Sequence, residues 1–178
     1  MARNLSSKCK QCRRAGQKLF LKAERCTTAK CSMVKRNFPP GAHGIKGYGR
    51  LTDYGNQLRE KQKAKKIYRI LEQQFRNYIL KANQAKANSE KILIELLEMR
   101  FDNVIYRAGF AKSRDLARQL INHNHFLVNG KRIDIPSYQV RIGDLISIKA
   151  KSSKLKFFSN LNEQIKNLYL NPTKQGNF

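Results

Sequence analysis

The chain has 178 residues, enough for one large or two small domains, and its 37 Lys and Arg against 12 Asp and Glu give a formal net charge of +25. Self-repulsion on this scale opposes compaction unless a polyanion neutralises it, which favours a nucleic-acid-binding protein. A membrane-surface protein is the competing class, but the sequence has no run of about 18 apolar residues and no secretory signal, so we predict no membrane partner.

The first 50 residues carry the densest charge. They contain 13 Lys and Arg and a single acid, whereas residues 91–150 contain ten basic and six acidic residues. Hydrophobic periodicity is weak in residues 1–50, so we predict a basic arm that lies on RNA and is ordered by something other than an apolar core. The candidate RNA-binding residues of this arm are Arg3, Lys10, Arg13, Arg14, Lys35, Arg36, Lys46, Tyr48 and Arg50.

All four cysteines fall in this arm, as Cys9-x2-Cys12 and Cys26-x4-Cys31. Two close pairs separated by a loop are typical of a zinc knuckle, because each short spacing lets two thiolates meet one tetrahedral ion. The neighbouring cations favour the thiolate form, and a metal would stabilise an arm that has few apolar residues. We therefore predict one structural zinc ion held by Cys9, Cys12, Cys26 and Cys31, with no open position for catalysis.

Three other arrangements of these cysteines are weighed against zinc. Disulfides are disfavoured in a chain without a secretory signal. Four unrelated thiols would not be expected to gather in one short segment. An iron–sulfur cluster uses the same ligands but lacks an evident redox partner here.

Residues 39–50 form a glycine-rich basic segment. It lacks the Gly-Lys-Ser/Thr ending of a nucleotide-binding P-loop, and no strand is predicted before it. We interpret it as a segment lying on an RNA backbone, and no small-molecule substrate is predicted. Tyr48 and Tyr54 have two open interpretations, stacking on a base or ordinary packing.

From about Tyr54 the pattern becomes helical. Apolar and aromatic side chains recur at intervals of three and four through Ile67–Ile79, giving one stripe. Lys61, Lys65 and Arg69 repeat at i, i+4 away from that stripe, so we predict that one helix faces both a core and an RNA backbone. A polar connection at residues 82–88 closes this helical domain of residues 51–90.

Residues 91–150 are predicted to form a small α+β RNA-binding module. Ser89 and Ser113 are candidate N-caps of helices, and Asp115 lies in the first turn of the second. Asn129-Gly130 between two strand-like runs predicts a hairpin, because a type I′ turn needs positive φ at both central residues.

The module ends with a turn at residues 141–144 and a strand at residues 145–148. The tail of residues 151–178 has weak periodicity, and we expect it to complete or return to the helical domain. The predicted fold class is therefore α+β, with a basic zinc-stapled N-terminal arm and a mainly helical domain followed by the small module.

His123 and His125 flank the end of the second of these helices. No Cys or carboxylate stands near them to form a metal site or a catalytic pair. Contact with a phosphate or base and capping of the helix C-terminus remain open. No nucleophile–base set or pair of carboxylates is evident elsewhere, so we predict that the protein is not an enzyme.

These features resemble the bacterial-type small-subunit ribosomal protein S-four family. The resemblance follows the family's order from near the N-terminus to about residue 150 and is highly specific as a set. It rests on five stretches: Cys9 to Cys31, Val34 to Gly41, Tyr54 to Lys63, Arg100 to Arg107, and Ala117 to Val140.

The resemblance implies a structural, primary rRNA-binding protein that binds a multi-helix junction in the 5′ domain of small-subunit rRNA. It implies an early role in subunit assembly, and neighbouring small-subunit proteins and mRNA near the channel through which mRNA enters. A bacterial cytoplasmic ribosome and an organelle ribosome are both compatible with the sequence. The RNA face of the module, by the family pattern, would include Arg107, Ser113, Arg114, Arg118, Gln119, His123, His125, Asn129 and Lys131.

Two departures from the family pattern are evident. Asn124 stands where the family usually has Gly, and we expect the turn to survive because Asn tolerates left-handed geometry. The family closes with a Trp-containing stretch and a terminal strand, whereas this chain has no Trp. The alternative functions are an RNA-modifying enzyme with the same module, such as a pseudouridine synthase, and a non-ribosomal RNA-binding factor.

Overall fold

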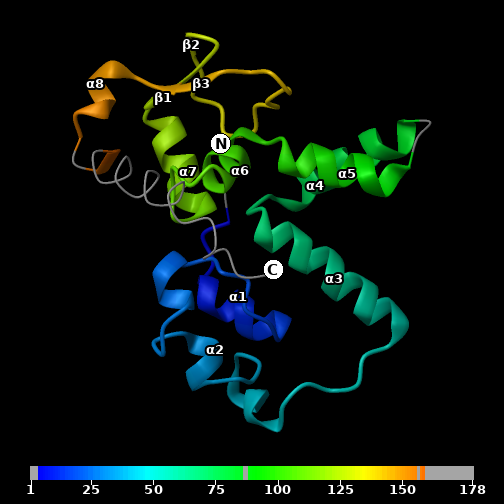
Figure 1. Cartoon of the computed structure of the whole chain (residues 1–178). Coiled ribbons are helices and arrows are strands. Elements are labelled where there is room, and N and C mark those ends of the chain that lie inside the picture. Colours follow the sequence, from blue (N-terminus) through cyan, green and yellow to red (C-terminus); the bar gives the residue numbers. More distant parts are fainter. Residues whose placement is uncertain (1–3, 86–87, 156, 159–178) are drawn as a thin grey trace, which may run out of the picture. The chain divides into compact units, whose positions relative to one another are not determined.

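The fold is described from a computed structural model that covers residues 4–85, 88–155, 157 and 158. Arg3 and most of the predicted tail lie outside the described residues. The elements run in chain order (Figure 1): α1 (Lys8–Ala15), η1 (Ala23–Cys26), α2 (Ser32–Lys35), η2 (Ala42–Lys46), α3 (Asp53–Ile67), α4 (Glu72–Gln84), α5 (Ser89–Glu98), α6 (Phe101–Arg107), α7 (Arg114–Asn122), β1 (Phe126–Val128), β2 (Lys131–Arg132), β3 (Ile146–Ile148) and α8 (Ala150–Ser153).

The chain divides into two compact units. Unit 1 contains Met1–Glu98 and Lys112–Asp115, and unit 2 contains Met99–Ala111 and Leu116–Phe178. Unit 1 thus takes in the predicted arm and the predicted helical domain. Of the segment predicted as the module, unit 1 also takes in residues 91–98 and 112–115.

The helical segment after Tyr54 is interrupted, so the prediction of one continuous helix was wrong. α3 ends at Ile67 and α4 begins at Glu72. Between them Arg69 adopts φ +57°, which is left-handed backbone that no α-helix continues through. Beyond this break Ile70 and Phe75 pack with Leu97 of α5 in a small buried cluster.

Helix caps are set by local side chains in unit 1. Thr52 caps α3, where its hydroxyl accepts a hydrogen bond from the Gly55 N–H at 3.2 Å. α5 is capped by Asn88, whose side-chain oxygen accepts from the N–H groups of Glu90 and Lys91. The cap therefore lies one residue before the predicted Ser89, which is already the first residue of the helix.

Unit 2 contains a three-stranded antiparallel sheet in the order β2-β1-β3. The predicted hairpin is confirmed: Val128 pairs with Lys131, and Asn129 and Gly130 have φ values of +50° and +74°. β3 begins at Ile146, within one residue of the prediction. α7 begins directly after Ser113, as predicted.

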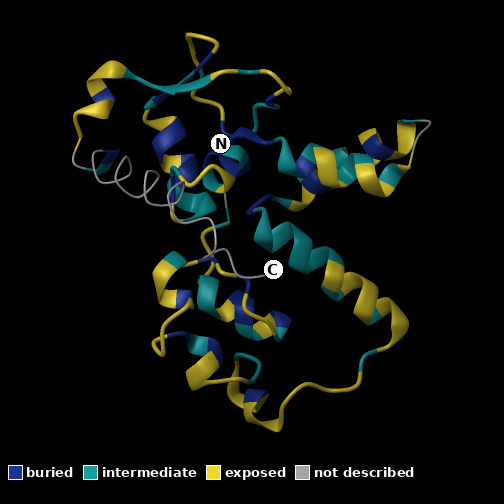
Figure 2. Ribbon diagram, in the orientation of Figure 1, coloured by how far each residue is buried: buried dark blue, intermediate teal, exposed yellow. Residues whose placement is uncertain are grey.

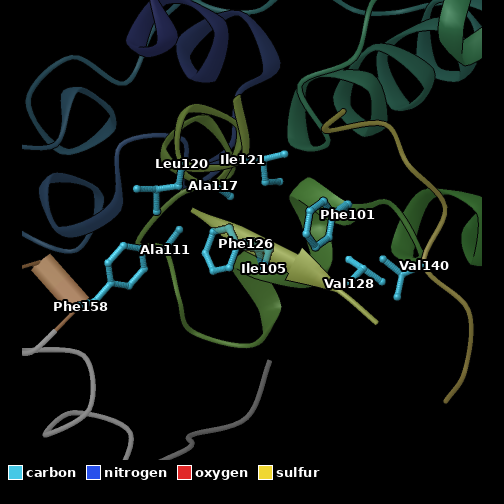
Figure 3. Packing of buried hydrophobic residues seen from close by; sticks show 10 residues of the cluster. All are labelled: Phe101, Ile105, Ala111, Ala117, Leu120, Ile121, Phe126, Val128, Val140 and Phe158. Atoms are coloured by element: carbon cyan, nitrogen blue, oxygen red, sulfur yellow. The ribbon is translucent and has the colours of Figure 1, made fainter. Parts of the chain in front are cut away.

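One hydrophobic core holds unit 2 together. Phe101 and Ile105 of α6, Ile121 of α7 and Phe126 of β1 are completely buried, and Phe126 makes edge-on contacts with Phe101, Phe110 and Phe158 (Figure 3). Burial in the described part of unit 1 is sparser, and α3 contains no buried residue (Figure 2). The two units are therefore stabilised in different ways.

Candidate nucleic-acid interface

A concave surface of about 550 Å³ in unit 1 is lined by cations. The cations come from α1, η1, α2 and the residues that flank α2, and no carboxylate is among the lining residues. Such a surface attracts phosphate groups. The cations are Lys10, Arg13, Arg25, Lys30, Lys35 and Arg36.

Four of these six cations are among the predicted RNA-binding residues, and the prediction missed Arg25 and Lys30. Arg25 directly precedes Cys26, and Lys30 lies between Cys26 and Cys31. Their nearness to Lys10 and Lys35 therefore depends on how this loop folds back. In the sequence, only the general charge density of the arm indicated that Arg25 and Lys30 could bind RNA. The surface formed by all six is called the basic concavity below.

Arg13 also has an internal role. Its Nε donates to the carbonyl of Phe38 at 2.9 Å, and a terminal nitrogen donates to the carbonyl of Pro39 at 3.1 Å. The guanidinium lies over the Phe38 ring, 4.8 Å from the centroid. Arg13 therefore ties α1 to the loop that begins the glycine-rich segment.

The four cysteines come from α1, η1 and the N-cap of α2, and all are free thiols. Cys12, Cys26 and Cys31 are buried and Cys9 is half-buried. Burial raises the pKa of the Cys12 thiol, and the nearby Cys26, Cys9 and Cys31 raise it further, so the three other thiols lie close enough to act on it. Within the described residues, however, no three His, Cys, Asp or Glu side chains are arranged to hold a metal ion.

Lys61 and Lys65 on α3 are half-buried and share one carboxylate. Their ammonium groups lie 2.5 and 2.7 Å from the two oxygens of Glu72. Hydrogen bonds from Lys61 and Lys65 lower the pKa of Glu72 to about 2. Part of the positive charge of these two predicted RNA contacts is thus balanced within the protein.

Arg69 is only 8% exposed, which does not fit its predicted place on an RNA-facing helix surface. Its Nε donates to Asp115 at 2.8 Å, and a terminal nitrogen donates to the Asn4 carbonyl at 2.8 Å. Asp115 also pairs with Lys8. Arg69 therefore joins three distant segments of unit 1, and we leave it out of the proposed RNA surface.

Arg118 is likewise buried, at 6% exposed, although the family pattern implied an RNA contact. Asp102 receives two hydrogen bonds from Arg100, at 3.0 and 2.8 Å, and lies 3.3 Å from a terminal nitrogen of Arg118. One buried carboxylate thus faces two guanidinium groups. This arrangement gives Arg118 a structural role inside unit 2, because a buried charge needs a partner.

The turn between α7 and β1 is a Schellman motif. Asn124 has φ +61°, its N–H donates to Ile121 at 2.8 Å, and the His125 N–H donates to Leu120 at 3.2 Å. The expectation that Asn124 preserves this turn is confirmed. Its side-chain oxygen also accepts from Arg132 Nε at 2.6 Å, which connects the turn to the hairpin.

The two histidines have different surroundings. His123 is exposed, whereas His125 is half-buried, with Nδ1 2.9 Å from the hydroxyl of Ser152 and its ring edge-on to Phe158. Burial lowers the pKa of His125, and the nearby His123 and Lys149 lower it further. His123 is therefore the better placed of the two for contact with a phosphate.

Asn129 is committed to the fold of unit 2. Its amide nitrogen donates to Asp144 at 2.8 Å, and its amide oxygen accepts from the Leu145 N–H at 2.9 Å. Both functional groups of the side chain connect the hairpin to the turn before β3. The neighbouring Lys131 on β2 is exposed.

The remaining predicted residues lie in different surroundings. Arg107 and Gln119 are exposed in unit 2, and Lys46 is exposed in unit 1. Ser113 and Arg114 belong to unit 1, where the Arg114 guanidinium lies 5.0 Å from the centre of the Tyr68 ring. Arg14, Tyr48 and Arg50 line a second cavity of unit 1, of about 410 Å³.

A carboxylate-free basic concavity and a small helix–hairpin unit define an RNA-binding protein. Family models agree: the ribosomal protein S4/S9 N-terminal domain matches residues 3–98, and the S4 domain matches residues 99–146. The chain belongs to the uS4 family of small ribosomal subunit proteins, which makes it an rRNA-binding structural component of the small subunit and not an enzyme. None of the helices in the described residues is long and apolar enough to cross a membrane.

Two similar curated relatives come from bacteria. Small ribosomal subunit protein uS4 of Nitrosospira multiformis is 56% identical over 152 residues, which cover 85% of this chain and 73% of the relative. Small ribosomal subunit protein uS4A of Clostridium novyi is 52% identical over 168 residues, which cover 94% of this chain and 81% of the relative.

Proposed function

We propose that the protein binds a multi-helix junction in the 5′ domain of small-subunit rRNA and acts early in assembly of the subunit. The basic concavity is the observation that supports this most directly, because a wall of six cations without a carboxylate suits a place where RNA strands converge. The specific rRNA site and the assembly role rest on the family resemblance. Recognition relies on phosphates, 2′-hydroxyls and junction shape more than on base sequence.

The proposed partners follow from the same resemblance. Neighbouring small-subunit proteins near the channel through which mRNA enters would contact the bound protein, and mRNA would pass nearby. A bacterial ribosome in the cytoplasm is the proposed location, since the two relatives described above are bacterial.

Salt dependence tests the rRNA proposal. Affinity of the full chain for the isolated 5′ domain rRNA should fall by about a thousandfold or more between about 50 and about 200 mM salt, as expected when six or more phosphates are neutralised. A flat response would contradict the electrostatic mechanism. The measurement is a filter-binding titration over a series of salt concentrations.

A pair of double variants locates the contribution of the basic concavity. Replacing Lys35 and Arg36 by Gln should reduce the steepness of the salt dependence by about two phosphate contacts. Replacing Lys81 and Lys91 by Gln removes the same charge from exposed positions outside the basic concavity. Equal loss in both variants would show that net charge, and not this surface, determines binding.

We further propose that one structural zinc ion is held by Cys9, Cys12, Cys26 and Cys31. The donor set supports it, since the four free thiols come from α1, η1 and the N-cap of α2, and Cys12 and Cys31 lie in one buried cluster. A bound ion would stabilise the thiolates and connect η1 to α1 and α2, which share a small buried cluster.

A further inference from the structure

The second cavity of unit 1 has an unusual wall. It is formed by residues 39–44 and 47–51 with Arg14 from α1 and Arg59 from α3, and it encloses about 410 Å³, within the range of roughly 300 to 1,000 Å³ typical of small-ligand sites. Three arginines and His43 line it, and no carboxylate does. We call it the Tyr48 pocket, after the tyrosine among its lining residues.

Glycines give this wall its curvature and leave its backbone bare. A Cβ at Gly44 would lie 1.9 Å from the carbonyl oxygen of Pro39, so the turn closes this tightly only with glycine there. Gly47 has φ +83°, which L side chains rarely adopt, and a Cβ there would meet nothing within 4 Å. Bare backbone facing open space allows a ligand to approach the main chain closely.

The ring of Tyr48 is held in a defined position. Its hydroxyl donates to the carbonyl of Arg13 at 2.5 Å, and its ring lies against the backbone of Gly16, where an added Cβ would be 3.4 Å from the ring. The guanidinium of Arg59 lies 5.5 Å from the ring centroid. Tyr48 nevertheless remains 38% exposed, so a fixed aromatic ring and a planar cation are both presented to the pocket.

We propose that the Tyr48 pocket takes one unpaired nucleobase of rRNA, which stacks on the Tyr48–Arg59 pair while Arg14 and Arg50 contact the flanking phosphates. This inference rests on the proposed rRNA-binding function and names a further contact within it. Unpaired RNA bases are bound by stacking on aromatic rings and on arginine planes. A phosphate alone would use the arginines but would gain nothing from an ordered ring.

Oligonucleotide binding tests the stacking contact. The probes are a single-stranded uridine oligonucleotide and an oligonucleotide of the same length with abasic riboses, bound to the full chain. Tyr48→Ala should weaken binding of the uridine oligonucleotide by about tenfold and leave the abasic one unchanged. Tyr48→Phe keeps the ring and should retain most of the affinity.

Tyr54 provides the matched control. It is 73% exposed on α3 and does not line the pocket, so Tyr54→Ala should change affinity by less than about twofold. Equal losses for Tyr48→Ala and Tyr54→Ala, or equal losses on the two oligonucleotides, would overturn the proposal. Hydrogen exchange of residues 4–50 identifies any variant that loses its fold.

A second measurement uses the unchanged protein. Rare 4-thiouridine substitution in the 5′ domain rRNA, followed by irradiation, should give a base cross-link in residues 39–51. Cross-links elsewhere with none in this segment would also overturn the proposal. If the wild-type chain binds this rRNA with steep salt dependence and Tyr48→Ala has no effect, only the pocket proposal fails; if the wild-type chain does not bind, the proposed function itself fails.

Discussion

Unit 1 and unit 2 differ in how their buried apolar residues are packed. The core of unit 2 is one continuous cluster centred on Phe101, Phe126 and Phe158. The described residues of unit 1 contain two smaller clusters, one around Cys12 and Leu19 and one around Ile70 and Phe75. Unit 1 therefore depends more on polar contacts than unit 2 does, and the proposed metal would add to them.

Arginine has a double use in both units. In unit 1, Arg13 and Arg69 hold carbonyl and carboxylate groups of distant segments, and in unit 2 Arg100 and Arg118 surround Asp102. A guanidinium suits this task because it has five donors in a rigid plane. Charge density in the sequence is thus not a direct measure of the RNA-facing surface.

Metal removal should give the largest difference in stability between the two units. Freshly purified protein should contain one zinc per chain by elemental analysis, and chelation should abolish hydrogen-exchange protection in residues 4–50, since structural zinc sites contribute about 10 kcal/mol or more. Protection of residues 116–149 should persist. Less than half an equivalent of zinc would count against the site, and Cys31→Ser should reproduce the effect of the chelator.

Truncation of a core side chain in unit 2 should destabilise unit 2 and leave unit 1 unchanged. Phe126→Ala removes a completely buried ring that contacts three other phenylalanines, and we expect unit 2 to lose about 3–5 kcal/mol of unfolding free energy. Hydrogen exchange should increase in residues 101–149 and not in residues 4–50. Leu127→Ala, on the half-buried face of the same strand, is the control and should cost less. Loss of protection in both units would show that they unfold together.

The smallest effect is expected at the Asp115 contacts of unit 1. Burial raises the pKa of Asp115, but Arg69 and Lys8 outweigh it and the pKa lies below its usual value. The carboxylate therefore stabilises the fold fully above the unfolded pKa of about 3.9, and this contribution is lost as pH falls through the lower folded pKa.

Asp115→Asn should lower unfolding free energy by about 2 kcal/mol near pH 7 and by less at pH 3, as measured by urea unfolding. Asp134→Asn, at an exposed position of unit 2, is the control. An identical loss at the two pH values would show that the charge of Asp115 does not matter.

Local features of unit 2 were predictable because they depend on neighbouring residues. Asn124, Asn129 and Gly130 adopt positive φ, which Asn and Gly tolerate better than other residues. The two-residue turn then pairs Val128 of β1 with Lys131 of β2. In unit 1 the break at Arg69 was missed because Arg has no local preference for left-handed backbone. That conformation is held by a partner 46 residues away.

The candidate site divides in the same way. Lys10, Lys35 and Arg36 were found from charge density alone, whereas Arg25, Lys30 and Arg59 were recognised only once folding placed them beside a cavity. Arg69 and Arg118, both predicted to contact RNA, are buried within the fold. The resemblance correctly indicated the ribosomal family, but it did not distinguish exposed from structural arginines.

The sequence by itself determined the net charge, the clustering of the cysteines, the turns and the family, because composition and short-range backbone preferences are properties of adjacent residues. Only the tertiary structure decided which cations face solvent and which hold the fold. Exposure is set by contacts between segments far apart in the chain, such as Arg69 with Asn4 and Asp115. The same contacts create the basic concavity and the Tyr48 pocket, which no local pattern describes.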